Sequence, residues 1–203
     1  MTLRYDEIGQ RLRAFRLGSG MSAEEVANRI GISRTAVYRF EKGEVVKIET
    51  LIGLAELLNV SLPTLLGVEI EYISSAVTYF ERLRQLETEA NQIIVLAGPI
   101  SYLLASDDFH ESLERLLKES VPETADHRDQ TLADIERIIE ILKERKANYL
   151  SRRPTIVNLM SAHDIVRLLR SGFVGQPFLP PDDLSERRAR ARREAQHFID
   201  LIE

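Results

Sequence analysis

The stretch GISRTAVYRFEKGE, residues 31–44, decides how the first part of the chain folds. Gly31 accepts the left-handed backbone of a tight turn, and Ser33 is a residue type that caps helix N-termini. In a helix that starts at Ser33, the polar side chains share one side: Arg34, Thr35 and Tyr38, with Arg39 at its edge. The opposite side is apolar: Ala36, Val37 and Phe40. We therefore expect a short helix that buries one side and presents a basic, aromatic side to solvent.

Two short helices are expected before this stretch. The first carries apolar residues at helical spacing: Ile8, Leu12 and Phe15. The second begins after Ser22, and Glu25 follows three residues later, which is the pattern of a capping box. The helix that starts at Ser33 is therefore the third along the chain.

Two more helices are expected after it. TLIGLAELL, residues 50–58, has one apolar stripe, and SLPTLLG, residues 61–67, places Pro63 in the first turn, where its missing N–H costs nothing. Five short helices within residues 1–67 predict a mainly α N-terminal domain.

The order MSAEEVANRIGISRTAVYRFEKGE, residues 21–44, followed by IETLIGLAELLNVSLPTLLG, residues 48–67, resembles the Cro/C1-type helix-turn-helix of the xenobiotic-response-element family of bacterial regulators. The resemblance rests on spaced positions: Arg16, Ala27, Gly31, Val37 and the EKG at 41–43. It implies that residues 1–67 form a five-helix DNA-binding domain. It also implies an ion pair between Arg16 and Glu41 that ties the first helix to the third.

The same resemblance implies how the third helix meets DNA. Its N-terminal part enters the major groove, where Arg34 can donate two hydrogen bonds to a guanine and the methyl group of Thr35 can contact a thymine. Tyr38 and Arg39 are expected to support this readout. A glutamine that braces a phosphate often follows the cap of the second helix, but this chain has Ala23 there. Phosphate contacts are therefore expected from other polar residues: Ser22, Ser33, Lys42 and Lys47.

Composition limits where nucleic acid can bind. The 203 residues carry a net charge of -5, and residues 1–68 hold 9 basic and 8 acidic side chains, against 18 and 24 in residues 69–203. A general basic coat is excluded, so DNA binding is expected to be confined to the N-terminal part. The chain has no cysteine, which excludes disulfides and thiolate metal sites. It also has no long apolar run. We expect a cytoplasmic protein without a membrane partner.

The rest of the chain predicts a helix-rich α/β domain. A connecting helix is expected over 68–91, followed by the domain itself over 92–203. Its expected elements are a buried strand at 92–98, a helix capped by Ser106, a helix at 126–149, a strand at 155–160, a helix after Ser161 and a final helix from Leu184. Two strands alone are marginally stable, so either GFVGQPF, residues 172–178, adds a strand or a partner subunit completes the sheet.

This order of strand, helices and strand faintly resembles one half of a phospholipase-D-like domain, a fold that also serves as a sensor in some regulators. The catalytic motif of that family needs His-x-Lys. The histidines here lack that lysine: His110, His127, His163 and His197. They are also scattered, so we expect no catalytic residue, metal or cofactor.

We interpret the chain as a DNA-binding transcriptional regulator that binds a pseudo-palindromic operator as a homodimer and senses a small-molecule effector. The expected shared surface is an apolar stripe, which alternatively packs within its own domain: Ile73, Val77, Phe80 and Leu83. If the two strands are parallel neighbours, the effector site lies beyond their carboxyl ends: Ser101, Tyr102, Ser161 and His163.

Two alternatives stay open at this point. The chain could be a constitutive repressor or antitoxin that uses the second domain for protein contacts, or an enzyme fused to a DNA-binding module. The basic run ERRARARRE, residues 186–194, is expected to be a solvated helix face, in which Arg187 and Arg190 lie near Glu194.

Overall fold

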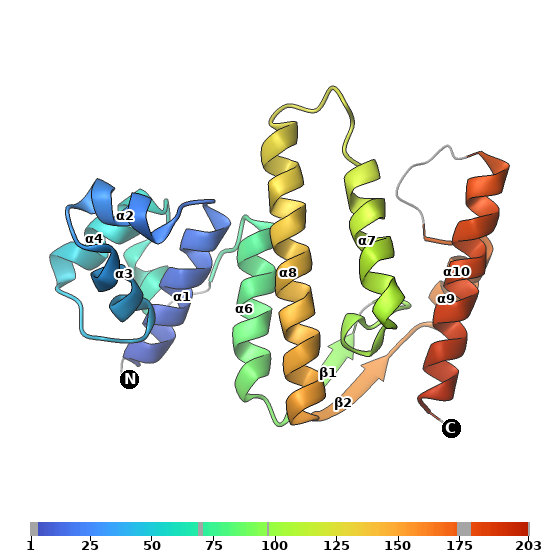
Figure 1. The fold of residues 1–203 in the computed structure, drawn as a ribbon. Coiled ribbons are helices and arrows are strands. Elements are labelled where there is room, and N and C mark those ends of the chain that lie inside the picture. The colour runs from blue at the N-terminus through green and yellow to red at the C-terminus, as the bar shows by residue number, and fades with distance from the viewer. Residues whose placement is uncertain (1–3, 69–70, 97, 174–179, 203) are drawn as a thin grey trace. The chain divides into compact units, whose positions relative to one another are not determined.

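The structure is a computed structural model that divides into two compact units, Met1–Leu86 and Glu87–Glu203 (Figure 1). It describes residues 4–68, 71–96, 98–173 and 180–202. Within these residues there are ten α-helices, one 3₁₀ helix and two strands. The predicted fold class is confirmed, because the N-terminal helices fit a helix-turn-helix domain and a small sheet lies in the C-terminal region.

Five helices build the N-terminal part of the first unit. They are α1 (Tyr5–Gly18), α2 (Ala23–Ile30), α3 (Arg34–Glu41), α4 (Ile48–Leu57) and α5 (Leu62–Leu66). Serine side chains cap three of them by accepting a backbone N–H, at Ser22, Ser33 and Ser61. The helices are too short to be stable alone, so they depend on packing against one another.

That packing forms one apolar core. Leu12, Leu54 and Leu65 are at most 1% exposed, and side chains from all five helices join them. Burying a leucine completely contributes about 1.5–3 kcal/mol, so this cluster is the main stabilising feature of the unit.

Gly9 lets two backbones touch. A Cβ atom at this position would lie 2.5 Å from the carbonyl oxygen of Phe40 and 2.7 Å from that of Glu41. Helix α1 therefore packs directly on the last turn of α3. The orientation of α3 depends on this backbone contact and on Val37, which is 1% exposed in the core.

Helix α6 (Ala76–Glu89) corrects the helix predicted from residue 68. Residues 68 and 71–75 are not helical, and Ser75 Oγ accepts the backbone N–H of Thr78 at 3.4 Å, as an N-cap does. The helix then packs on α1, where Gln85 Nε2 donates to the carbonyl of Gln10 at 3.0 Å.

The apolar stripe proposed as a shared surface is partly buried within the chain itself. Val77 is 1% exposed, while Ile73, Phe80 and Leu83 are half-buried. Thr78, next to Val77, donates from Oγ1 to the carbonyl of Ala14 in α1 at 3.4 Å. The side of α6 that carries Val77 is thus occupied by its own unit.

The second unit alternates strands and helices. Its elements are β1 (Gln92–Leu96), the 3₁₀ helix η1 (Tyr102–Leu104), α7 (Asp107–Glu119), α8 (Arg128–Arg152), β2 (Thr155–Leu159), α9 (Ala162–Ser171) and α10 (Pro181–Asp200). The strands are parallel neighbours, with Ile94 opposite Val157. The crossover between them contains α7 and α8, which pack side by side, and α9 packs against α10 (Figure 1).

The prediction of a buried first strand is wrong. Exposure alternates along both strands, and one face of the sheet carries exposed aliphatic side chains: Ile94 (61%), Leu96 (77%), Val157 (36%) and Leu159 (55%). Parallel strands are usually covered on both faces, and here the described residues cover only one. The further strand predicted at 172–178 lies largely outside the described residues.

The prediction of a solvated basic face on α10 is also wrong. Arg187 is 8% exposed and donates to Glu119 Oε2, and Glu194 is 3% exposed and accepts the backbone N–H and the hydroxyl of Ser106. Ser106 therefore precedes α7 without capping it through its own side chain. These partners lie 68 and 88 residues away in sequence, so local spacing cannot reveal them.

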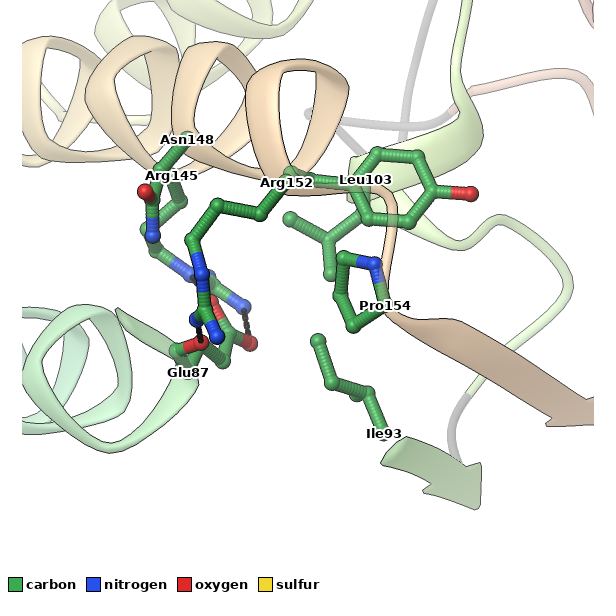
Figure 2. Close-up of a pocket in the computed structure, with 8 residues that line it drawn as sticks. Glu87, Ile93, Leu103, Arg145, Asn148, Arg152 and Pro154 are labelled. Atoms are coloured by element: carbon green, nitrogen blue, oxygen red, sulfur yellow. Dashed lines mark hydrogen bonds and ion pairs between the residues drawn. The ribbon is translucent and has the colours of Figure 1, made fainter. Parts of the chain in front are cut away.

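Helix α8 holds the last turn of α6. Figure 2 shows Arg145 beside Glu87, and Arg145 donates from Nε and Nη2 to the two carboxylate oxygens at 2.8 and 2.6 Å. Arg152 reaches the same turn, where its Nη1 donates to the carbonyl of Glu87 at 3.2 Å and to that of Thr88. These bonds fasten the chain at the entrance to the second unit.

Candidate DNA-binding site

The turn between α2 and α3 sets the start of the candidate recognition helix. Gly31 ends α2 in the left-handed conformation, with φ 72° and ψ 32°, which glycine adopts without strain. Ser33 then caps α3, and its Oγ accepts the backbone N–H of Ala36 at 3.1 Å. The two helices therefore begin and end at defined residues.

Helix α3 has an apolar side and a polar side. Val37 is buried, with Ala36 and Phe40 half-buried beside it. The other side is exposed to solvent: Ser33, Arg34, Thr35, Tyr38 and Arg39. The predicted readout residues are thus all accessible to solvent, with Arg34 and Thr35 in the first turn of the helix and Tyr38 and Arg39 in the second.

Arg34 and Tyr38 interact on this face. The Arg34 Nη2 atom donates to the Tyr38 hydroxyl at 3.3 Å, and the guanidinium carbon lies 5.5 Å from the centre of the phenol ring. This hydrogen bond raises the pKa of the Arg34 guanidinium, which stays fully protonated. The contact limits the rotamers of Arg34 and leaves its other N–H groups for an acceptor such as a guanine.

Arg39 is held by an acidic neighbour. Its Nε atom donates to Glu44 Oε2 at 2.6 Å, and Nη2 forms an ion pair with the same oxygen. Both side chains are about half exposed, so the pair is weak and can exchange for a phosphate or a base. Sequence reasoning missed Glu44 as a competitor for DNA. One local signal points to this contact. Helix α3 ends at Glu41, and Gly43, with φ 89°, then turns the chain so that Glu44 comes back toward Arg39.

The residues predicted to contact phosphate lie at helix ends. Ser22 and Ser33 are exposed, and each uses Oγ as the acceptor of a helix cap. The backbone N–H of Ser22 also donates to Glu25 Oε2 at 2.8 Å, so only its hydroxyl hydrogen stays available to a phosphate. Lys42 and Lys47 are exposed and follow α3. These lysines are the stronger phosphate candidates because each carries a charge.

Arg16 and Glu41 meet beneath this surface. Arg16 donates from Nε and Nη2 to Glu41 at 2.5 and 3.1 Å, and from Nη1 to the carbonyl of Met21 at 3.1 Å. The two side chains are 9% and 5% exposed. The pair joins α1, the turn before α2 and the end of α3, which is the role that the resemblance implies for these residues.

The residues predicted for an effector site belong to the second unit. The strands are parallel, which was the condition for that prediction. Ser101 is buried, Ser161 and His163 are exposed, and the Tyr102 ring packs on His110 with 4.7 Å between ring centres. Among the described residues no hydrogen bond joins any two of the four. Convergence on one pocket therefore stays a prediction.

Several buried polar atoms of the second unit have no hydrogen-bond partner in the described part of the chain. They are Tyr102 Oη, His110 Nε2 and both side-chain amide atoms of Asn158. Burial raises the pKa of Tyr102, so this phenol is neutral, and burial lowers the pKa of His110. Within the described ranges no group of three or more His, Asp or Glu side chains could hold a metal ion. No helix there is long and apolar enough to cross a membrane.

Comparison with known proteins places the family resemblance on the first unit. Residues 12–65 match the family model described as helix-turn-helix. No curated protein and no solved structure matches the chain. The likeness of the second unit to a phospholipase-D-like half therefore stays untested. Residues 12–65 are a helix-turn-helix of the Cro/C1 type, and this domain supports a DNA-binding transcriptional regulator.

Proposed function

We propose that the chain controls transcription as a homodimer that reads a pseudo-palindromic operator through α3, and that its second unit senses a small molecule. The observation that carries the DNA-binding part is the exposed face of α3. Arg34, Thr35 and Tyr38 lie together on a helix whose opposite side is fixed in the core by Val37. Such a helix can enter the major groove without rearranging the fold.

Base readout is assigned to Arg34 and Thr35, and phosphate contacts to Lys42 and Lys47. Arg34 can donate two hydrogen bonds to one guanine, whereas a lysine at the end of the helix provides a charge without base preference. Tyr38 keeps Arg34 in place through the bond between their side chains. Arg39 contributes a further contact to DNA once its ion pair with Glu44 has broken.

Two observations support the proposed dimer: the small size of a single helix-turn-helix and an exposed apolar face in the second unit. One recognition helix contacts few base pairs, so such proteins pair on half-sites about one helical turn apart. The exposed sheet face of Ile94, Leu96, Val157 and Leu159 is a better candidate for the shared surface than the stripe on α6, because Val77 is already buried. A second copy that covers this face removes four aliphatic side chains from water.

Sensing is supported by the division of the chain. The second unit has its own secondary structure, unpaired buried polar groups and cavities, and it carries none of the residues assigned to DNA. A unit used only for pairing needs no such interior. The alternative is a constitutive repressor, whose affinity for its operator does not respond to any small molecule.

The test is binding-site selection on the full chain, followed by affinity measurements on the selected operator with and without small molecules recovered from native protein. We expect an operator of two related half-sites and an affinity that changes with ligand. If the selection enriches no particular sequence, the assignment of sequence-specific DNA binding is overturned. A specific operator whose affinity no recovered ligand alters would favour the constitutive repressor.

A further inference from the structure

The second unit contains a cavity of about 520 Å³ that the sequence did not predict. It lies where η1 and the start of α7 meet the C-terminal end of α8 and the last turn of α10. Cavities that hold small ligands generally measure about 300–1,000 Å³. None of the four residues predicted for an effector site lines it.

One part of the cavity wall is apolar and the other part is cationic. Leu104, Leu150 and Leu201 contribute aliphatic surface, and the last two are 53% and 55% exposed. The charged part contains Lys146 and Arg153. A chain with a net charge of -5 therefore concentrates positive charge beside exposed hydrocarbon at one place. This combination suits a molecule with an apolar body and an anionic end.

Lys146 is the centre of the charged part. It is 9% exposed, and its Nζ atom donates to the carbonyl of Ala105 and to Asp107 Oδ1, both at 2.7 Å. An ammonium group has three N–H donors, so one of them has no acceptor in the described part of the chain. A buried charge with a spare donor at the wall of a cavity can receive a ligand carboxylate.

Asp107 holds the place that such a carboxylate would take. Its side chain is 96% exposed although its partner is buried, and it contacts Lys146 through one oxygen. The hydrogen bond from Lys146 lowers the pKa of Asp107, so the carboxylate is ionised. A surface carboxylate bound at one point contributes little to stability and can leave without breaking the fold.

Two further groups define the rim. Arg153 is the C-cap that follows α8, with φ 49°, and it has no ion-pair partner within the described residues. His197 points a ring nitrogen at the carbonyl of Leu104, with 3.0 Å between Nε2 and the oxygen. When Nε2 carries the hydrogen, it donates to this carbonyl, and the other ring nitrogen is left to accept from a ligand or from water.

We infer that this cavity binds an amphipathic monocarboxylate, whose carboxylate replaces Asp107 on Lys146 and contacts Arg153 while its hydrocarbon lies on Leu150 and Leu201. The inference rests on the proposed sensing function only for the effect of the ligand on DNA. Binding itself is a separate claim. The competition between ligand and Asp107 distinguishes this site from an apolar cavity that accepts any hydrocarbon.

The experiment is calorimetric titration of the full chain, without DNA, with straight-chain monocarboxylates from butanoate to dodecanoate and with decanol. We expect saturable binding of at least one carboxylate, and binding of decanol more than about tenfold weaker. The absence of saturable binding across the whole series would overturn the inference. Equal affinity for decanoate and decanol would also overturn it, because the cationic wall would then have no role.

Paired variants test the residues. Lys146→Met should weaken binding of the tightest carboxylate more than about tenfold, while Lys143→Met, an exposed lysine on the same helix, should leave it unchanged. Asp107→Ala should tighten binding roughly twofold to fivefold, because the competing carboxylate is gone, and Asp108→Ala should not. If the Lys146→Met protein does not fold, the Asp107→Ala protein still tests the site, because the Asp107 side chain is 96% exposed. Weaker or unchanged binding in Asp107→Ala contradicts the competition.

A second measurement separates this inference from the proposed function. The tightest carboxylate is added to the complex of the full chain with its selected operator. A change in operator affinity supports the cavity as the sensing site. Carboxylate binding that leaves operator affinity unchanged would retain the site and reject its role in sensing.

Discussion

The side chains of Arg16 and Glu41 lie 25 residues apart in sequence and form a two-point ion pair that is almost completely shielded from water. A buried pair of this kind is costly to break at one end, because the remaining charge keeps its desolvation cost and loses its partner.

Breaking this pair should therefore unfold the DNA-binding unit more readily. We expect Glu41→Ala to lower the free energy of unfolding by about 3 kcal/mol. Thermal or denaturant unfolding of the full chain measures the change. The double variant Arg16→Met with Glu41→Leu should recover a large part of the loss, and a double variant as unstable as Glu41→Ala would contradict the explanation.

Arg34→Ala should weaken binding to the selected operator by roughly fivefold to 150-fold, because one bidentate contact to a guanine is lost. It should also relax the preference at one base position of each half-site. Lys42→Ala is the matched control, and it should weaken binding to all sequences alike. If the Arg34→Ala protein retains its full sequence preference in binding-site selection, Arg34 does not read a base.

Glu44→Gln should increase affinity for DNA of any sequence. The change removes a negative charge from the surface that we propose contacts DNA, and it frees Arg39 from its ion pair. One additional phosphate contact should steepen the dependence of the logarithm of affinity on the logarithm of salt concentration by about one. Titrations at several salt concentrations measure this slope, and an unchanged slope would show that Arg39 does not reach phosphate.

Leu96→Lys should dissociate the dimer if the exposed face of the sheet is the shared surface. Leu96 is 77% exposed, so the substitution removes no packing within the chain and should leave the folded monomer stable. Light scattering at micromolar concentration measures the mass. Tyr72→Lys is the control, because that side chain is 78% exposed in the other unit. A Leu96→Lys dimer would exclude the sheet face.

The second unit should lose stability as the pH falls, because His110 is buried. Burial lowers its folded-state pKa below the ordinary value of 6.5, so the unfolded chain binds a proton more readily. Stability is then lost as the pH falls from about 6.5 toward the folded pKa, with a slope of at most about 1.4 kcal/mol per pH unit for one proton. His110→Phe should flatten this part of the profile, and an equal slope in both proteins would refute the cause.

The first unit could be predicted from sequence because its decisive signals are local. The capping box of Ser22 and Glu25, the left-handed Gly31 and the cap at Ser33 each act within three residues, and the structure contains all of them. The prediction that α6 begins at residue 68 is wrong for a related reason: Ser75 is also a capping residue, but the apolar spacing before it is typical of a helix as well.

The second unit was predicted less well because distant partners decide it. The sequence around Glu194 is typical of a solvated acidic residue, and only the fold shows that Ser106 is its partner. The exposure of Ile94 likewise depends on which face of the sheet the helices cover. The cavity escaped prediction for the same reason. Lys146 and Tyr149 share one side of α8 and Arg153 follows its end, but His197 and Leu201 come from the end of α10, about 50 residues further along the chain.

The contact at Gly9 has a consequence for how new specificities arise. Because α1 touches the backbone of α3, the position of that helix does not depend on its solvent-exposed side chains. Residues 34, 35, 38 and 39 can therefore change during evolution or in the laboratory while the helix is presented at the same angle. Position 9 has no such freedom, so diversity in operator choice among descendants of this chain should accumulate on one face of α3 around an unchanging glycine.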